Sequence, residues 1–262
     1  MKIKTEKYAR FLTFHKKVII IVSSITLFVI VVVVGVLFSL QTWNQYSDGY
    51  HQHFSQAKTD IDSVILQTTK TKTDMTGKLS RVIQIQNKIK SQVNSYCQVN
   101  PLVVWQRFIT VYSDKIKNCE THKTNLDKVL HDLSNLTEFL SADNKLSAII
   151  SAANEKTVAN NQSEKWNLIE PLWRQAIIDI SKLPNTADLK LTKTISTDVT
   201  TKIAEAWQQL ASSNTAKDRQ KFEDARNNLN KAYISLATIA DNSKSETDKL
   251  ISNLSASYNT AF

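Results

Sequence analysis

The feature that most constrains this chain is an uncharged apolar run at residues 18–40 (VIIIVSSITLFVIVVVVGVLFSL). As an α-helix this run would extend about 35 Å, and the hydrocarbon core of a bilayer is about 30 Å thick. A helix satisfies its own backbone hydrogen bonds, as lipid requires of any segment that crosses it. The sequence therefore predicts a transmembrane helix over residues 18–40.

The charges on either side of this run predict its direction. Residues 1–17 contain six Lys or Arg and one acid, Glu6, whereas residues 41–57 contain no Lys or Arg. Because basic flanks stay in the cytoplasm, we expect the N-terminus inside and everything beyond residue 40 outside. Trp43, Tyr46 and Tyr50 would then lie in the outer aromatic belt. The prediction is a single-pass protein of the cell membrane.

A cleaved secretory signal is the alternative interpretation of the same run. Such a signal needs an apolar core of about 7–15 residues followed by a small-x-small cleavage site. The core here is longer, and its end (LFSLQTW) offers no convincing pair of small residues. The sequence therefore favours an uncleaved signal anchor.

The net charge of +9 is in large part an orientation signal. Of the 33 basic and 24 acidic side chains, six and one lie in the first 40 residues, which leaves 27 and 23 for the rest. Both signs are mixed along the outer part, a pattern typical of a solvated helical surface. Nucleic-acid binding needs a basic stripe that this part lacks.

Scarce glycine restricts both fold and chemistry. The chain has three glycines, Gly35, Gly49 and Gly77, and none follows residue 77. Tight β-hairpins and phosphate-cradling loops depend on glycine. We therefore predict an all-α fold without a glycine-rich nucleotide site.

Apolar residues recur at steps of three and four along the outer part, which predicts helices that pack through apolar seams. Such seams are typical of an antiparallel helical bundle with coiled-coil-like packing. The seams comprise Trp43, Tyr46, Tyr50, Phe54, Ala57, Ile61 and Val64; Met75, Leu79, Val82, Ile89, Val93 and Tyr96; Leu126, Val129, Leu133, Leu136 and Leu140; and Phe222, Ala225, Leu229, Ala232, Leu236 and Ile239.

The first seam has two interpretations. It is the best candidate for a self-association stripe, and intramolecular packing explains it equally well. The residues of this candidate stripe are Trp43, Tyr46, Tyr50, Phe54, Ile61 and Val64.

Breaks between helices are predicted from prolines and polar clusters. Proline disfavours helical geometry in the preceding residue, so a helix should end at residues 183–186 (LPNT) and another should begin near Pro171. A polar loop is expected at residues 159–163. The threonine-rich residues 188–201 are predicted to form an extended connection that enters a helix, with a lone strand as the alternative.

The two cysteines, Cys97 and Cys119, are expected to form one disulfide, because they lie outside the membrane and are even in number. A straight helix from Pro101 through Cys119 would separate the sulfurs by more than about 20 Å. A bridge requires Cα atoms within about 7 Å. We therefore expect that helix to end by about Ile116, and the next to restart at Thr124, where Thr124 and Asp127 resemble a capping box.

Aromatic side chains inside the predicted disulfide loop are the candidate interaction surface. Their spacing is helical, and any of them that are exposed would offer a partner an apolar contact. They are Trp105, Phe108 and Tyr112.

We predict no catalytic, cofactor or metal site. His51 and His53 are two residues apart and would diverge on a helix. His122 and His131 have no evident ligand partners. The acidic pairs Asp60–Asp62 and Glu223–Asp224 are interpreted as solvated faces, and Trp105, Trp166, Trp173 and Trp207 as core or interface packing.

The predicted organisation has four parts: a basic cytoplasmic tail (1–17), a transmembrane signal anchor (18–40), a juxtamembrane helical stalk (41–97) and an extracytoplasmic helical domain (98–262). The expected function is that of a structural or protein-interaction module of the cell envelope, not of an enzyme. Expected partners are the bilayer and another envelope protein or a second copy. The alternative is a sensor-like domain for a small ligand, in which the tryptophans would line an open pocket.

Overall fold

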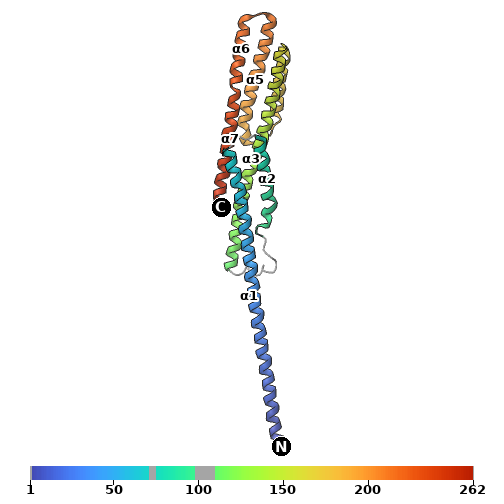
Figure 1. The fold of residues 1–262 in the computed structure, drawn as a ribbon, viewed down its shortest axis with the longest axis vertical. Helices are drawn as coiled ribbons and strands as arrows, with labels where there is room; N and C mark the ends of the chain where they lie inside the picture. Colours follow the sequence, from blue (N-terminus) through green and yellow to red (C-terminus); the bar gives the residue numbers. More distant parts are fainter. Residues whose placement is uncertain (1, 71–74, 98–109, 262) are drawn as a thin grey trace. The chain divides into compact units, whose positions relative to one another are not determined.

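The fold is all-α, as predicted from the scarcity of glycine and the helical seams. The computed structural model describes the backbone of residues 2–70, 75–97 and 110–261, and the side chains of residues 22–65, 77–97 and 113–261; this part contains no β-strand (Figure 1). The elements are α1 (Lys2–Lys70), α2 (Met75–Gln92), η1 (Val93–Ser95), α3 (Thr110–Gln162), η3 (Trp166–Leu168), α4 (Ile169–Ser181), α5 (Ala187–Ala216), α6 (Arg219–Ile234) and α7 (Leu236–Ala261).

The chain folds into two compact units. Unit 1 comprises Met1–Ser55 and Ser95–Glu120, and unit 2 comprises Gln56–Asn94 and Thr121–Phe262. The predicted stalk, residues 41–97, is divided between the two units. Both α1 and α3 contribute to each unit as single uninterrupted helices.

The apolar run lies inside α1. This helix is long and apolar enough to cross a membrane, with a mean hydropathy of 2.7 over 18 residues, and residues 22–38 are exposed along their whole length. Trp43 differs from the aromatic-belt prediction, because its side chain is only 2% exposed and packs edge-to-face against Tyr46 at 5.2 Å. A ring buried in unit 1 cannot face lipid.

In unit 2, α1, α2, α3 and α7 form a four-helix bundle in which polar contacts join each helix to the next. The predicted seams are buried here, with Ile61, Val82, Ile89 and Leu133 among the most enclosed side chains. The contacts are Asp60 with Lys88 (2.6 Å), Gln86 with Thr137 (3.3 Å), Asp132 with Ser257, and Asp62 with Tyr258.

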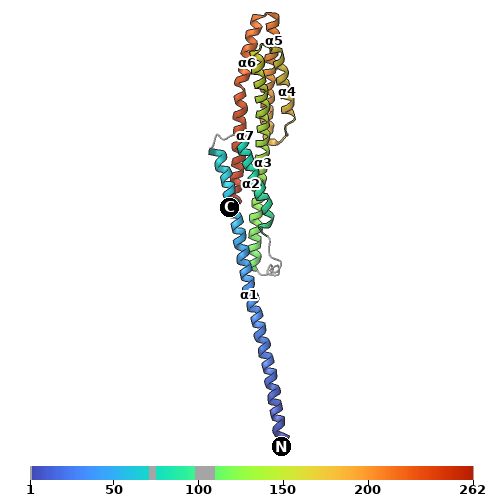
Figure 2. The ribbon, with the colours of Figure 1, turned by 45° about the vertical axis from the view of Figure 1, so that its right-hand side comes forward.

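Further along α3, helices α4, α5 and α6 complete a second set of packed helices. Helix α5 lies between α4 and α6, and its start also packs against α7 (Figures 1 and 2). The indole N–H of Trp173 in α4 donates to Thr157 in α3, and Asn242 in α7 donates to Thr192 in α5. Short connections at residues 163–165, 182–186 and 217–218 make neighbouring helices antiparallel.

Helix α3 corrects the predicted break after Ile116. It continues through Cys119 and Thr124 to Gln162, so the helix end expected by about Ile116 and the capping box are wrong, and the polar loop expected at 159–163 begins only at Ser163. Ile116 and Cys119 are buried and extend the apolar seam towards Leu126, while no Gly or Pro interrupts it. The predicted helix start at Pro101 lies outside the described residues.

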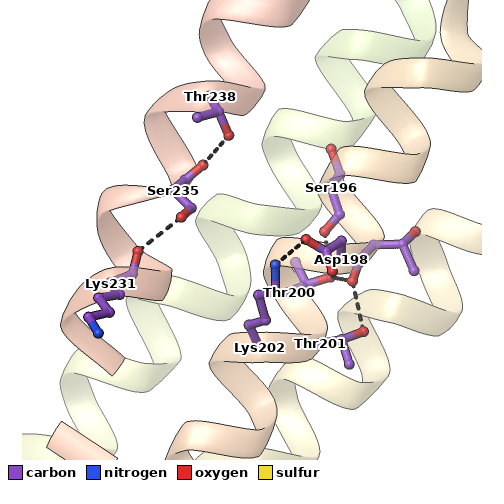
Figure 3. Close-up of polar contacts among 9 residues, drawn as sticks. Ser196, Asp198, Thr200, Thr201, Lys202, Lys231, Ser235 and Thr238 are labelled. Carbon is purple, nitrogen blue, oxygen red and sulfur yellow. Dashed lines mark hydrogen bonds and ion pairs between the residues drawn. The ribbon is translucent and has the colours of Figure 1, made fainter. Parts of the chain in front are cut away.

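Helix α5 corrects the prediction of an extended connection at residues 188–201. Thr186 caps the helix by accepting a hydrogen bond from the backbone N–H of Leu189, 3.3 Å away. Hydroxyl groups within the helix donate to carbonyls four residues earlier, as Ser196 does to Thr192. Figure 3 shows the same bond from Thr200 to Ser196. Burial of one face therefore outweighs the β-propensity of threonine.

Two proline predictions are confirmed, and one seam is interrupted. Helix α4 ends at Ser181 just before Pro184, and Pro171 lies in its first turn. The seam from Phe222 to Ile239 is split, because α6 ends at Ile234 and α7 begins at Leu236. At this break the Ser235 hydroxyl donates to the Lys231 carbonyl, and the Thr238 hydroxyl donates to the Ser235 carbonyl (Figure 3).

The end of α5 offers a test of backbone strain. Lys217 adopts a left-handed conformation with φ of 54°, which is costly for a residue with a Cβ. We expect Lys217→Gly to raise the free energy of unfolding by about 1 kcal/mol. Urea unfolding of the full chain in detergent micelles, followed by circular dichroism, measures this change.

The matched control is Gln209→Gly on the exposed face of the same helix, which should lower the free energy of unfolding by about 1 kcal/mol. A Lys217→Gly variant no more stable than the unmodified protein would contradict the strain at Lys217.

Candidate functional site

Cys97 and Cys119 form the predicted disulfide, with their Cα atoms 5.9 Å apart. Cys97 lies in a turn directly after η1, and Cys119 lies inside α3. Because α3 begins at Thr110 and continues through Cys119, the described chain does not turn back after Ile116. The sulfur of Cys119 also lies 3.6 Å from the carbonyl oxygen of Tyr96.

The predicted interaction surface in this loop is outside the described side chains. Trp105 and Phe108 precede the described part of α3, and Tyr112 belongs to α3 without a described side chain. The neighbouring Tyr96 is buried; it stacks on His53 at 5.0 Å and contacts Phe54 edge-on at 5.3 Å.

The candidate self-association stripe is covered within the single chain. Trp43, Phe54, Ile61 and Val64 are buried, and Tyr46 and Tyr50 are half-buried. Intramolecular packing, the other interpretation of this stripe, accounts for these positions.

The histidines lie apart from one another. The His51 ring lies 4.2 Å from the Tyr50 ring, whereas His53 stacks on Tyr96. His122 places Nδ1 3.3 Å from the carbonyl oxygen of Ala261, near the end of α7. No group of three or more potential metal-binding His, Cys, Asp or Glu occurs among the described residues.

Two tryptophans form a packed cluster with Tyr233. Trp173 is 0% exposed and Trp207 is 4% exposed. Trp173 donates to Thr157 at 2.9 Å, and Trp207 lies within hydrogen-bond distance (3.4 Å) of the Tyr233 hydroxyl. Burial raises the pKa of Tyr233, although its hydrogen bonds to Trp207, Thr157 and Trp173 act in the opposite direction. This cluster is solid core and not the wall of a pocket.

Trp166 occupies a different environment, and Trp105 lies outside the described residues. The Trp166 ring is half-buried and lies 5.8 Å from the Phe222 ring. Its indole N–H is buried without a hydrogen-bond partner.

The acidic pairs separate into two kinds. Asp60 and Asp62 join helices, Asp60 through Lys88 and Asp62 through Tyr258, so their interpretation as solvated faces is wrong. Burial and the hydrogen bond to Asp62 raise the pKa of Tyr258 to about 12. Glu223 and Asp224, in contrast, lie on the outer face of α6.

Asp143 is a buried acid that the sequence analysis missed. It is 3% exposed in α3 and accepts a hydrogen bond from Ser243 of α7. Burial raises the pKa of this carboxyl group, and the hydrogen bond from Ser243 partly offsets the rise. Asp143 comes three residues after Leu140 on the same apolar seam, so its spacing in the sequence already indicated that its side chain would be buried.

Replacing Asp143 tests this burial. At neutral pH, Asp143→Asn should raise the free energy of unfolding by on the order of 1 kcal/mol, because a poorly compensated buried charge is removed. The raised pKa means that the folded protein binds more protons than the unfolded chain between the two pKa values. Stability of the unmodified protein should therefore rise as pH falls through the folded pKa.

Urea unfolding of both proteins between neutral and mildly acidic pH measures the effect. The stability advantage of Asp143→Asn should shrink as the pH is lowered towards the unfolded pKa. An advantage that is constant with pH, or a less stable variant, would contradict the burial of a charged Asp143.

Three surface grooves lie between helix pairs in unit 2. One between α3 and α4, of ≈ 330 Å³, is lined by four alanines, including Ala148 and Ala152, together with larger apolar and polar side chains. A second between α5 and α6, of ≈ 340 Å³, contains Lys202 and Glu205, and a third between α2 and α3 measures ≈ 400 Å³. No tryptophan lines any of these three grooves.

Comparison with known proteins finds no matching family model, no matching curated protein and no matching solved structure. The interpretation of function therefore rests on the chain's own residues.

Proposed function

We propose that this protein is a membrane-anchored structural or protein-interaction module of the cell envelope. Helix α1 would fix it in the bilayer with the N-terminus in the cytoplasm, and the helical bundle would lie outside. Its partner would be a second protein in the same envelope or another copy of the chain. The proposed action is contact between helix faces, without catalysis.

The observation that carries this proposal is the continuity of α1. The same helix contains the exposed apolar run and, further along, the buried residues Ala57, Ile61 and Val64 of the four-helix bundle. One helix thus supplies both the membrane-length apolar run and a stretch of the bundle core. Such a connection suits a display or scaffolding role.

The packed tryptophans favour this function over the ligand-binding alternative. A sensor domain that used Trp173 and Trp207 would need an open pocket with converging polar groups. Both rings are instead buried, and their indole N–H groups point to Thr157 and Tyr233. Trp173 and Trp207 are therefore packed in the core, where the ligand-binding alternative expected them to line an open pocket.

Site-specific crosslinking in native membranes tests the proposal. Photoreactive residues at Leu168 and Ile178, two exposed apolar positions on η3 and α4, would sample the bundle surface, with Val33 in the apolar run as a lipid-facing control. We expect protein adducts from the bundle positions, identified by mass spectrometry as a second copy or another protein. Recovery of no protein adduct from these and further exposed bundle positions would contradict an interaction module.

A further inference from the structure

Asp143 is the one charged side chain that is buried in the described part of the chain. It lies in α3 and is 3% exposed, and its carboxylate accepts a hydrogen bond from the Ser243 hydroxyl of α7. A buried carboxylate that has a neutral donor and no cation beside it is costly in its charged form. Binding of a proton removes that cost.

Buried hydroxyl groups on α5 and α7 are already engaged within or between these two helices. Ser196 donates to the carbonyl of Thr192 at 2.7 Å, and Thr247 donates to the carbonyl of Ser243 at 2.9 Å. The Thr192 hydroxyl accepts a hydrogen bond from Asn242 at 2.7 Å. Among the described residues, Ser243 therefore remains the one side-chain donor to the buried carboxylate of α3.

No neighbouring cation neutralises Asp143 either. On α7, Lys244 pairs with Asp248 at 2.8 Å, and Lys249 pairs with Glu246 at 3.2 Å. Burial raises the pKa of Asp143 and the Ser243 hydrogen bond lowers it by less, with no contribution from a charged group. The other charged side chains on the packed helices are Lys78 and Arg81 of α2, Lys145 of α3, Asp188, Lys190 and Lys193 of α5, and Asp241 of α7.

The partner of Asp143 lies where α7 contacts two other helices. Ser243 of α7 reaches α3, and the adjacent Asn242 donates to α5. The buried face of α7 carries Ser243 and Thr247 before it reaches Leu250 and Leu254. Small hydroxyl side chains bury less apolar surface than leucines do, so this part of α7 loses less when it separates from the bundle.

We propose that Asp143 is a proton-binding site that controls the contact of α7 with α3 and α5. With the proton bound, the neutral carboxyl group stays buried against Ser243 and the contact is closed. When the proton is lost, the charged group is better solvated by water, so the middle of α7 separates from α3 more often. This inference is independent of the proposed interaction function, since either can fail without the other.

The direction of the pH dependence follows from linkage. Because the pKa of Asp143 is raised in the folded protein, the closed form binds more protons than the opened form between the two pKa values. The contact is therefore tightest below the pKa of the opened form and weakens as the pH rises through the pKa of the closed form. A single proton changes the opening equilibrium by at most about tenfold per pH unit.

Hydrogen exchange of the full chain in non-ionic detergent micelles, followed by mass spectrometry of its peptides, tests the proposal. Protection is calculated against the intrinsic exchange rate at each pH, from neutral to mildly acidic. We expect protection of residues 243–250 to rise at least about fivefold as the pH falls. Protection around Trp207 and Leu210, further along α5, should change by less than about twofold. An equal change in all helices, or none in α7, would overturn the proposal.

Three variants identify the group that binds the proton. Asp143→Asn has no carboxyl group to ionise, so protection of residues 243–250 at neutral pH should be at least about fivefold higher than in the unmodified protein and independent of pH. Ser243→Ala removes the donor to the charged form, so protection should fall most at neutral pH and the pH dependence should increase. Asp241→Asn changes an exposed acid of α7 and is the matched control, which should behave as the unmodified protein does.

Circular dichroism verifies that each variant is helical before exchange is measured. Retained pH dependence in Asp143→Asn, or loss of that dependence in Asp241→Asn, would overturn the assignment of the proton to Asp143. An equal loss of protection at every pH in Ser243→Ala would show that Ser243 acts on packing alone, and would contradict control of the contact by the charge of Asp143.

Discussion

Trp173→Ala is expected to lower the free energy of unfolding by about 3–5 kcal/mol. The Trp173 side chain is fully buried in α4, and its ring meets the Tyr233 ring edge-on with centroids 6.1 Å apart. Truncation would leave a cavity between α3, α4 and α6 and would remove the donor that Thr157 accepts. Urea unfolding of the full chain in detergent micelles, followed by circular dichroism, measures the loss.

A matched control separates burial from helix propensity. Ile178→Ala changes an exposed position, 49% accessible, on the same helix and should alter stability by less than about 1 kcal/mol. Trp173→Phe keeps an aromatic ring but removes the hydrogen bond to Thr157, so its loss should be intermediate. Equal losses for Trp173→Ala and Ile178→Ala would contradict a solid tryptophan cluster.

The double variant Cys97→Ser, Cys119→Ser is expected to lower the stability of unit 1 by about 3 kcal/mol. The disulfide joins positions 22 residues apart and ties the turn after η1 to α3. Without it, the unfolded ensemble of this segment gains entropy, while the packing of Tyr96 on His53 and Phe54 remains. Because the bridge lies in unit 1, the effect should be concentrated there.

Amide hydrogen exchange of the full chain in detergent micelles measures this local effect. Protection should fall at Tyr96 and along the start of α3 up to Glu120, while Leu133 and Leu136 in unit 2 keep theirs. As a control, thiol alkylation of the unmodified protein without reductant tests whether the disulfide is formed. Neither Cys97 nor Cys119 should then carry the label. Unchanged exchange in the double variant would contradict a stabilising role for the disulfide.

The helical seams were predictable because burial follows the helical period closely in this chain. Leu126, Val129, Leu133, Leu136 and Leu140 are all enclosed, as their spacing indicated. The disulfide was also predictable, from its cysteine count and predicted compartment. The sequence pattern could thus identify which residues are buried and which cysteines pair.

Helix boundaries were less predictable where tertiary packing decides them. The expected stop near Ile116 assumed that Cys119 lies beyond the end of the helix, whereas Cys119 lies inside α3 and still forms the disulfide with Cys97. Threonines at positions 192–201 favour strands in isolation, but burial against α7 and hydroxyl bonds to the helix backbone keep α5 helical. Neither effect is visible in local spacing.

The candidate sites depended on contacts between distant segments, and these were the least predictable. The spacing of Thr124 and Asp127 predicts a capping box, yet α3 continues through both residues and leaves Asp127 on the wall of the α2–α3 groove, which Lys90 also lines. Asp143 could have been noticed in the seam, but its partner Ser243 lies 100 residues away in the sequence. Pairings over such separations follow from the order in which helices pack, which the seams alone do not determine.

Labelling of introduced cysteines on intact cells tests the membrane arrangement of the whole protein. A membrane-impermeant maleimide is applied to cells that carry Asn228→Cys, on the exposed face of α6, or Lys4→Cys, in the N-terminal tail. An anchor with the N-terminus inside predicts that the cysteine at position 228 is labelled on intact cells and the cysteine at position 4 only after permeabilisation. Labelling of position 4 on intact cells, or protection of position 228 there, would contradict a bundle held outside the membrane by α1.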